Sequence, residues 1–450
     1  MKFTNPMKKN WTQRYHITIW IRMFGAFITS LSSSMLAPFF LLYLHDKLDG
    51  AVLVPMLIVG LQPLTDIIVT LLGGGITDRL GRKPVMLLAL TMQSIAMSGF
   101  MLADSVLSFA LLYMLHGAGQ SLFVPAQRAQ IADVTTDSQR VEVFGLLNTI
   151  SYIGLALGPV GGMLLFHYDP SWLFGIEAFS LFIYMLVCWW KLPETAPVSS
   201  ALRSSSDQAE ALETKNKETR SSQRSGASSH VPPVPAGKHR FFSSHRITAL
   251  ITRYKHVLIL MVYTLPISFF YAQTETTFRI YLQESFVNYV SIIATLSTIK
   301  AILAVALQLP LVKLTEHISF QRVMLLSCSC FMVTALAYGF SKSIVVLIVV
   351  QLFWTVGETI GLTRLHTYIS EIVPPEERGR YFSLHGIHWD ISRTFGPFLG
   401  GVVLLTFGGQ TLFGICLILL LLSGFLFFRS PNLHKLTGQH VDFLKKTVIK

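Results

Sequence analysis

Ionisable side chains lie inside long apolar segments of this sequence, and these are the residues whose types allow chemistry. Glu358 lies about halfway along the apolar run over 344–370. A charged side chain in the middle of a bilayer is costly, so it tends to face a polar cavity and to be functional. An acid there can exchange protons and attract a cation. We therefore predict a functional Glu358, with a protonated structural acid that hydrogen-bonds a neighbour as the alternative.

A pair of opposite charges falls within another apolar segment. Glu275 and Arg279 are four residues apart in a helix predicted over 256–283. This spacing places both side chains on one face, in the favourable acid-before-base order. The pair is either a structural ion pair or a switch whose partner changes with protonation. Lys300 and Asp66 are further candidates for contact with protons or a ligand.

The stretch "LHGIHWDISRTFGP" carries two more pairs of polar residues. His385 and His388 share one helix face, and Asp390 and Arg393 share another. The histidine pair can titrate at physiological pH. No carboxylate lies at metal-ligand spacing on its face, so we predict no metal site. Asp390 with Arg393 is an internal ion pair or part of a substrate site.

Three other polar residues in apolar segments favour structural roles. We expect Arg22 to reach back to the membrane interface. Glu177 is expected near the outer end of its helix, and His116 is expected to be a packed core histidine. None of them enters the predicted site.

The elements that must position these residues are membrane-spanning helices. The chain has 450 residues, of which 52% are hydrophobic and only 13% are charged. Apolar stretches of about 20 residues, long enough to cross a bilayer as helices, recur along it. The pattern predicts an all-α membrane protein with twelve transmembrane helices, over 16–44, 51–75, 84–103, 107–132, 142–166, 172–190, 256–283, 288–313, 322–340, 344–370, 380–406 and 411–428.

Basic residues alternate along the chain, whose formal net charge is +12. The loops that contain Arg82, Arg140, Arg322 and Arg378 are basic, as are both termini, while the intervening loops carry few bases. This asymmetry predicts that the basic loops and both termini are cytoplasmic, in a multi-pass protein of the cell membrane. Because the bases lie between apolar segments and not on one folded face, we expect no nucleic-acid binding.

The sequence repeats itself at a distance of 238 residues, a shift that brings Phe40 onto Phe278 and Pro159 onto Pro397. Two six-helix halves with the same orientation imply a substrate held between them near the bilayer midplane. The connection between the halves is rich in Ser, Pro and charge, a composition that favours disorder. We therefore predict three regions, namely an N-terminal six-helix bundle over 1–195, a disordered cytoplasmic linker over 196–250 and a C-terminal six-helix bundle over 251–450.

The stretch "GGITDRLGRKP" between the second and third segments is similar to the loop between helices 2 and 3 of the major facilitator superfamily. The resemblance implies the two-bundle fold and a glycine that lets helix 2 approach helix 11. It also implies an acid at the N-terminus of helix 11 and basic residues that brace a cytoplasmic gate. The residues that match this gate motif are Gly74, Asp78, Arg79, Gly81, Arg82 and Lys83.

A second motif, in the fifth segment, resembles the Gly-Pro motif of the drug:proton antiporter branch of that superfamily. A kinked and tightly packed helix is the alternative interpretation. Glu275 and the stretch "VGE" that ends at Glu358 are similar to Gram-positive multidrug:proton antiporters, which implies proton coupling and cation recognition for these two acids. The residues of the Gly-Pro motif are Gly154, Gly158, Pro159 and Gly162.

These features predict a secondary active transporter that needs no cofactor because the proton gradient drives it. Its predicted function is proton-coupled export of hydrophobic or cationic compounds by alternating access. The predicted partners are a small-molecule substrate, protons and the lipid bilayer, and the predicted functional unit is a monomer. Alternatives are a proton-coupled transporter of a specific nutrient, metabolite or lipid and, more distantly, a non-transporting membrane sensor. The sequence contains no Gly-x-Ser-x-Gly, His-Glu-x-x-His or P-loop pattern, so we expect neither an enzyme nor direct use of ATP.

Overall fold

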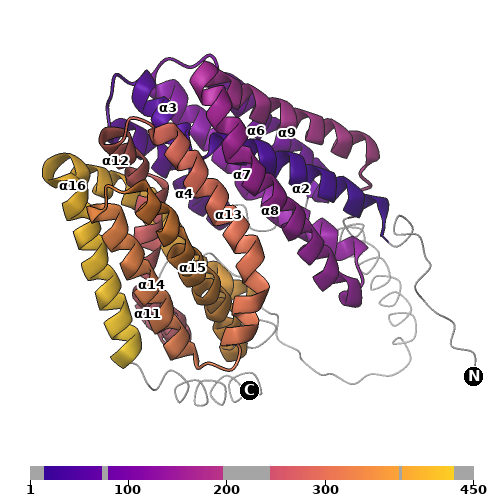
Figure 1. Ribbon diagram of the computed structural model, residues 1–450. Coiled ribbons are helices and arrows are strands. Elements are labelled where there is room, and N and C mark those ends of the chain that lie inside the picture. Colours follow the sequence, from indigo (N-terminus) through magenta and orange to yellow (C-terminus); the bar gives the residue numbers. More distant parts are fainter. Residues whose placement is uncertain (1–14, 73–79, 196–243, 374–377, 430–450) are drawn as a thin grey trace, which may run out of the picture.

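The structure is a computed structural model in which two helical bundles pack side by side, one from each half of the chain (Figure 1). It describes residues 15–72, 80–195, 244–373 and 378–429, and these contain helices but no strand. Most of the predicted linker lies outside the described residues. So do Gly74, Asp78 and Arg79 of the gate motif.

The helices follow the predicted segments in chain order. Those of the N-terminal bundle are α2 (Ile17–Leu36), α3 (Phe40–Lys47), α4 (Leu53–Leu72), α6 (Arg82–Phe100), α7 (Val106–Val134), α8 (Asp137–Tyr168) and α9 (Ser171–Lys191). Those of the C-terminal bundle are α11 (Ser244–Glu275), α12 (Thr277–Ser285), α13 (Tyr289–Thr315), α14 (Phe320–Phe340), α15 (Ile344–Ile372) and α16 (Arg378–Arg429).

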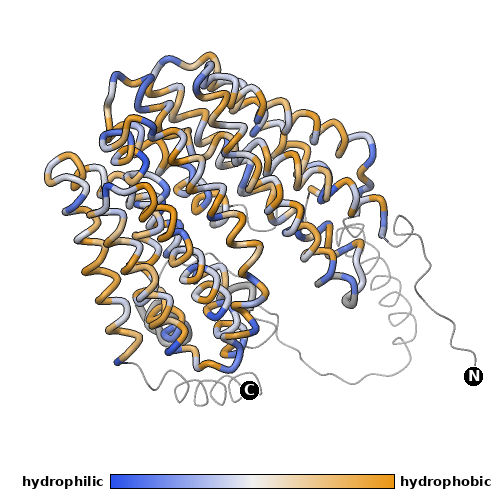
Figure 2. Tube along the Cα trace, in the orientation of Figure 1, coloured by the Kyte–Doolittle hydropathy of each residue, from blue (hydrophilic) through white to orange (hydrophobic). Residues whose placement is uncertain are grey.

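Apolar composition along these helices confirms the predicted multi-pass membrane protein. Ten of the described helices are long and apolar enough to cross a membrane. α6 adds a further predicted segment, and it begins with two basic residues and a proline. Figure 2 shows hydrophobic colouring along both bundles, with hydrophilic colouring concentrated at helix ends and connections.

The first and seventh predicted segments are each broken in two, so the continuous helices predicted over 16–44 and 256–283 are wrong. α2 ends just before Pro38 and α3 resumes after it, because proline has no backbone N–H and disfavours helix at the preceding residue. α11 and α12 are separated at Thr276, whose backbone is not helical (φ −126°, ψ −82°) and whose hydroxyl donates to the carbonyl oxygen of Ala272 at 2.6 Å. The repeat aligns Thr276 with Pro38, so both bundles break at the same point.

The last two predicted segments both lie in α16. At Gly408 the backbone leaves the helical conformation (φ 81°, ψ 168°), a positive φ that glycine adopts at low cost. The chain therefore turns there, between the segments predicted over 380–406 and 411–428. With this turn the described helices account for all twelve predicted spans.

Glycines of the fifth-segment motif pack α8 closely against α2. A Cβ atom on Gly158 would lie 2.7 Å from the carbonyl oxygen of Leu31, and one on Gly154 would lie 2.8 Å from the Leu31 nitrogen. The absence of a side chain lets the two helix backbones approach one another. This seam is formed by Gly154, Gly158 and Gly162, and Pro159 lies in the same helix.

The second half repeats this seam, with α16 against α11. A Cβ atom on Gly396 would lie 2.9 Å from the Cβ of Ala272, and one on Gly400 would lie 3.0 Å from the methyl group of Thr277. The two glycines occupy the repeat positions of the α8 motif. The sequence repeat is therefore also a repeat of helix packing.

Two pairs of long helices join the halves, α4 with α16 and α8 with α13. Gly60 of α4 faces the backbone carbonyl of Thr394 and has no room for a side chain. The short helices α3 and α12 also meet, and there Gln283 Nε2 donates to Asp46 Oδ1 at 3.2 Å. In Figure 1 the bundles converge at this α3–α12 end and diverge toward the opposite end.

Candidate functional site

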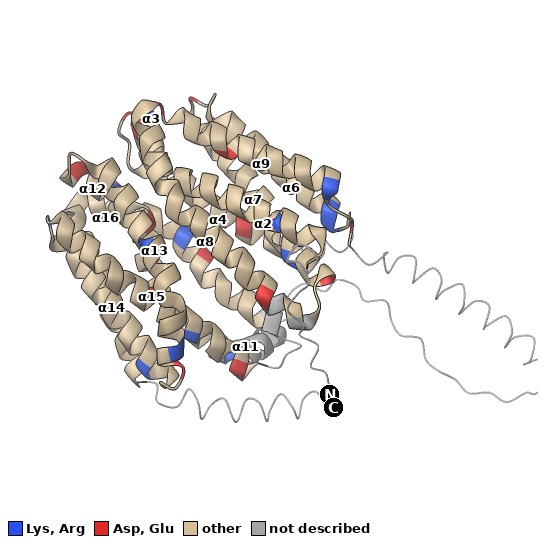
Figure 3. Cartoon of the chain, turned by 45° about the vertical axis from the view of Figure 1, so that its right-hand side comes forward, with Lys and Arg blue, Asp and Glu red and all other residues tan. Residues whose placement is uncertain are grey.

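A cavity of about 440 Å³ lies between the two bundles, and residues from both halves line it. Charged positions are sparse along the helices in Figure 3, with a few red and blue positions in the interior between α8 and α13. Since each charge in an apolar bundle is costly, the polar residues around this cavity are the first candidates for function.

Glu358 lies in this cavity on α15 and is held by two partners. Trp354, one helical turn earlier, donates its indole Nε1–H to Glu358 Oε2 at 3.1 Å. Lys300 reaches across from α13 and places Nζ 3.5 Å from the same oxygen. The sequence offered both residues as separate candidates, and the structure brings them together as an ion pair.

Aromatic rings complete the surroundings of the lysine. Its Nζ lies 5.0 Å from the centre of the Trp354 ring and 5.9 Å from that of Tyr271, and these two rings lie 4.5 Å apart. A cation over aromatic faces gains about 0.5–2 kcal/mol. Lys300, Trp354, Tyr271 and Glu358, here called the Glu358 cage, thus form a site that holds one positive charge.

A second cavity, of about 530 Å³, lies mainly within the N-terminal half. Four of its lining residues lie at the repeat positions of the Glu358 cage. Three of the four carry no formal charge, and the fourth is a histidine, so this half lacks the acid–lysine pair at these positions. In the order Tyr271, Lys300, Trp354 and Glu358, the equivalents are Ser33, Gln62, His116 and Gln120.

Glu275 and Arg279 both line the two cavities. The break at Thr276 lies between them, so the continuous helix on which their predicted pairing depended is absent. Arg279 Nη1 instead donates to the backbone carbonyl of Ala37, at the equivalent break of the first half. No ion pair between Glu275 and Arg279 is among the contacts of the described side chains, although the two charges interact at longer range.

Asp66, Asp390 and Arg393 lie near one another where α4 meets α16. Ser121 of α7 donates its hydroxyl to Asp66 Oδ1. Arg393 interacts electrostatically with both acids. The cluster therefore links the two halves, a relationship that the spacing of Asp390 and Arg393 alone did not indicate.

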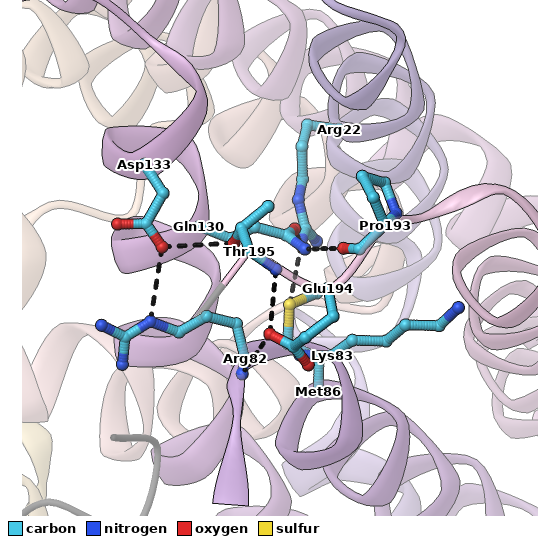
Figure 4. A network of polar contacts seen from close by, with 9 residues as sticks. All are labelled: Arg22, Arg82, Lys83, Met86, Gln130, Asp133, Pro193, Glu194 and Thr195. Carbon is cyan, nitrogen blue, oxygen red and sulfur yellow. Dashed lines mark hydrogen bonds and ion pairs between the residues drawn. The ribbon is translucent and has the colours of Figure 1, made fainter. Parts of the chain in front are cut away.

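The described part of the gate motif is held by a residue that the sequence analysis missed. Glu194, after the end of α9, accepts the backbone N–H groups of Arg82 and Lys83, each at 3.0 Å (Figure 4). Gly81 before them has φ 95°, and a Cβ there would lie 2.9 Å from Glu194 Oε2. The available signal was the acid in "LPET", which follows an apolar segment. A carboxylate at a membrane boundary can accept the free N–H groups at the start of a neighbouring helix.

Arg82 adds a link to α7 in the same network. Its Nε lies 3.5 Å from Asp133 Oδ2, and Thr195 donates its hydroxyl to that oxygen at 3.2 Å (Figure 4). The basic residue of the motif thus ties the start of α6 to the end of α7 and to the segment after α9.

Arg22 does not reach the membrane interface, which corrects that expectation. Its side chain is 0% exposed and lies among helices of the N-terminal bundle (Figure 4). Nη1 donates to the Tyr184 hydroxyl at 2.8 Å, and Nη2 contacts Met86 Sδ at 2.7 Å and donates to Gln130 Oε1. Side chains of α6, α7 and α9 hold both terminal nitrogens of the guanidinium inside the bundle.

The predicted histidine pair does share a face of α16. The rings of His385 and His388 lie 4.3 Å apart, and both side chains are buried. Across residues 15–72, 80–195, 244–373 and 378–429, no group of three or more His, Cys, Asp or Glu side chains is placed to hold a metal ion.

Comparison with known proteins decides the family. A family model described as the Major Facilitator Superfamily matches residues 22–286 and 267–445. The chain belongs to the major facilitator superfamily. It is 41% identical over 411 residues to the MFS-type transporter YhjO of Bacillus subtilis strain 168, which covers 91% of this chain and 92% of YhjO.

More distant relatives of this facilitator have names that state a cargo or an ion. The multidrug resistance protein MdtG of Salmonella typhi is 23% identical over 412 residues, 90% of this chain and 92% of MdtG. A Na(+), Li(+), K(+)/H(+) antiporter of Planococcus maritimus is 31% identical over 186 residues, 40% of this chain and 42% of that protein. The family and these relatives are transporters and not enzymes.

Solved structures confirm the facilitator fold. The nucleoside transporter NupG superposes with a TM-score of 0.70 at 12% identity, covering 92% of this chain and 99% of NupG. A peptide transporter POT superposes with a TM-score of 0.68 at 14% identity, covering 95% and 97%. At these identities the likeness concerns the fold alone.

Proposed function

We propose that this facilitator exports hydrophobic or cationic compounds in exchange for protons. The observation that carries the proposal is the Glu358 cage, in which an intramembrane carboxylate holds a positive charge against aromatic rings in a cavity between the two halves. The names of the distant relatives MdtG and the cation/proton antiporter support the same class of activity.

Proton coupling follows from the chemistry of the cage. Deprotonated Glu358 attracts Lys300, whereas a proton on Glu358 removes that attraction and frees the lysine. Because Lys300 lies on α13 and Glu358 on α15, the proton changes a contact between two helices that line the cavity. Positive charges in one apolar interior repel each other, so a cationic substrate and a proton each weaken the binding of the other, and this linkage is reciprocal.

Alternating access supplies the transport step. The α3–α12 contacts close one end of the space between the bundles, and Arg82 and Lys83 of the gate motif, at the start of α6, lie toward the other end. With the basic loops on the cytoplasmic side, the conformation described is open toward the cytoplasm, from which an exporter loads its cargo. We propose placement in the cell membrane with both termini inside, function as a monomer and no cofactor besides the proton gradient.

The test is dye transport into inverted membrane vesicles energised by an imposed proton gradient. We expect gradient-dependent ethidium uptake by the native protein and its loss in Glu358→Gln. Glu284→Gln, which removes an exposed acid at the end of α12, is the matched control and should transport normally. Transport that survives in Glu358→Gln would remove this carboxyl from coupling. No dye movement by folded native protein would favour a specific nutrient, metabolite or lipid as cargo.

A further inference from the structure

Glu177 of α9 is a buried acid without a counter-ion. Its side chain is 3% exposed and lines the 530 Å³ cavity of the N-terminal half. Its Oε2 has no hydrogen-bond partner among the described residues, and neither has Nδ1 of His116, which lines the same cavity. A buried carboxylate without a counter-ion is costly, so a positively charged occupant that compensates this charge would be stabilised. Glu177 lies within two turns of the start of α9, as expected for a position near a helix end, but it faces this cavity, and the packed histidine His116 lines the same cavity.

The repeat shows that Glu177 is specific to the first half. Its equivalent in the second half is Ile415, whereas the equivalent of Glu358 in the first half is Gln120. Each half therefore has an acid beside its cavity that the other half lacks at the repeat position. Lys300 already balances Glu358, and within the described residues no cation pairs with Glu177.

The other charges of this cavity come from the second half and are matched. Arg279 interacts with Glu275, and Arg393 interacts with Asp66 and Asp390. Hence Glu177 is the acid of this cavity whose charge the described surroundings leave uncompensated.

The lining of the cavity suits a molecule with one polar end. The hydroxyl groups of Ser32 and Ser33 on α2 lie within hydrogen-bonding reach of the Glu177 carboxyl, and Gln93 and Gln127 add amide groups to the wall. Apolar surface is contributed by Met97, Leu90, Phe123 and Leu181. An acid set among hydroxyl, amide and apolar groups matches an ammonium or phosphonium centre that carries hydrophobic substituents.

We propose that Glu177 binds the positively charged group of a lipophilic cation, which makes the N-terminal cavity the cation subsite of this transporter. The proposal rests on the proposed function and deepens it. It assigns cation recognition to Glu177 and leaves Glu358, with its tethered lysine, as the proton-responsive group.

The experiment measures equilibrium binding of radiolabelled tetraphenylphosphonium to purified full-length protein in detergent. This probe is a permanent cation, so its own charge does not change with pH. We expect Glu177→Gln to weaken binding at least tenfold, while Glu177→Asp, which keeps the carboxyl group, binds within about threefold of native protein. Glu284→Gln is the control for removal of an acid elsewhere. Triphenylphosphine oxide, a neutral aromatic probe, should bind Glu177→Gln and native protein equally.

A second measurement needs no variant and so does not depend on the folding of Glu177→Gln. Dicyclohexylcarbodiimide converts a protonated carboxyl in an apolar site to an N-acylurea, which mass spectrometry of peptides locates. We expect Glu177 of the native protein to be labelled, and tetraphenylphosphonium to protect it.

The outcomes separate this proposal from the proposed function. Native affinity in Glu177→Gln together with loss in Glu358→Gln overturns the subsite and leaves cation transport in place. Labelling of Glu177 that the cation does not reduce also overturns it. Absence of tetraphenylphosphonium binding to folded native protein overturns both the subsite and the cationic cargo.

Discussion

The carboxyl group of Glu194 accepts the backbone N–H of Lys83 at 3.0 Å, across a sequence separation of 111 residues. It thereby joins the segment after α9 to the first turn of α6 and stabilises the charged end of the gate motif. A carboxylate at this position satisfies N–H groups that have no partner within the helix and interacts favourably with the helix dipole.

Removal of this carboxylate tests its contribution to stability. We expect Glu194→Ala to lower the free energy of unfolding by about 1 kcal/mol, the usual cost of losing a helix cap. Thermal unfolding followed by intrinsic fluorescence of the purified protein measures the change. Glu284→Ala removes an exposed acid at the end of α12 and should leave the midpoint unchanged. Equal midpoints for Glu194→Ala and native protein would contradict the capping role.

The buried guanidinium of Arg22 predicts strong coupling with Gln130. Gln130→Leu removes an acceptor from a fully buried cation, which costs about 1–3 kcal/mol or more. Arg22→Met removes the charge and keeps an apolar side chain of similar length, so it should cost less. The double variant should be more stable than the sum of the single changes predicts, by about 0.5–3 kcal/mol. A double-mutant cycle in unfolding free energy measures this coupling, and strict additivity would refute it.

The α8 seam offers a pair of glycines in one helix with opposite surroundings. A Cβ on Gly158 would lie 2.7 Å from the Leu31 carbonyl oxygen, whereas one on Gly145 would meet nothing within 4 Å. We expect Gly158→Ala to destabilise the protein by about 1–3 kcal/mol through overpacking. Gly145→Ala should be neutral or stabilising by up to about 1 kcal/mol, because alanine favours the helix. Thermal midpoints of the two variants compare them directly, and similar midpoints would exclude a close-packed seam.

The ammonium group of Lys300 supplies the positive charge of the Glu358 cage, so removal of this group should let an external cation bind there. We expect Lys300→Gln to increase tetraphenylphosphonium binding by up to about tenfold, since 1.4 kcal/mol corresponds to a factor of ten and lies within the range of cation–π contacts. Lys300→Arg keeps the charge and should bind as the native protein does. The increase should disappear in the Lys300→Gln/Glu358→Gln double variant, and an increase that persists there must arise at another place.

The sequence was sufficient to predict the membrane class, the twelve spans and the repeat, because these depend on apolar runs and on matches within one chain. It predicted neither the break at Pro38 nor the break at Thr276. A proline marks the first break, but only the backbone conformation and the side-chain hydrogen bond of Thr276 reveal the second. Each apolar run continues through its break, so hydropathy alone predicts one helix for each of the two segments.

The candidate site was predictable in its members but not in its pairings. Glu358 and Lys300 stand out as charges in apolar segments, yet their contact joins helices separated by a third one in the chain. Glu177 was dismissed because position along a helix was taken as the guide to its surroundings. Burial depends on which face the neighbouring helices cover, and that information is absent from the local sequence.

The two glycine seams also indicate which helix contacts stay fixed when the two bundles move relative to each other. Each seam packs a long helix closely against a neighbour within its own bundle, α8 against α2 and α16 against α11. The opposite faces of the same helices, α8 toward α13 and α16 toward α4, meet the other bundle. Each of these two helices therefore has one face packed within its own bundle and the opposite face against the other bundle, where the two halves must move relative to each other during alternating access. A ligand that binds at α8–α13 or at α4–α16 should therefore block movement of one bundle against the other.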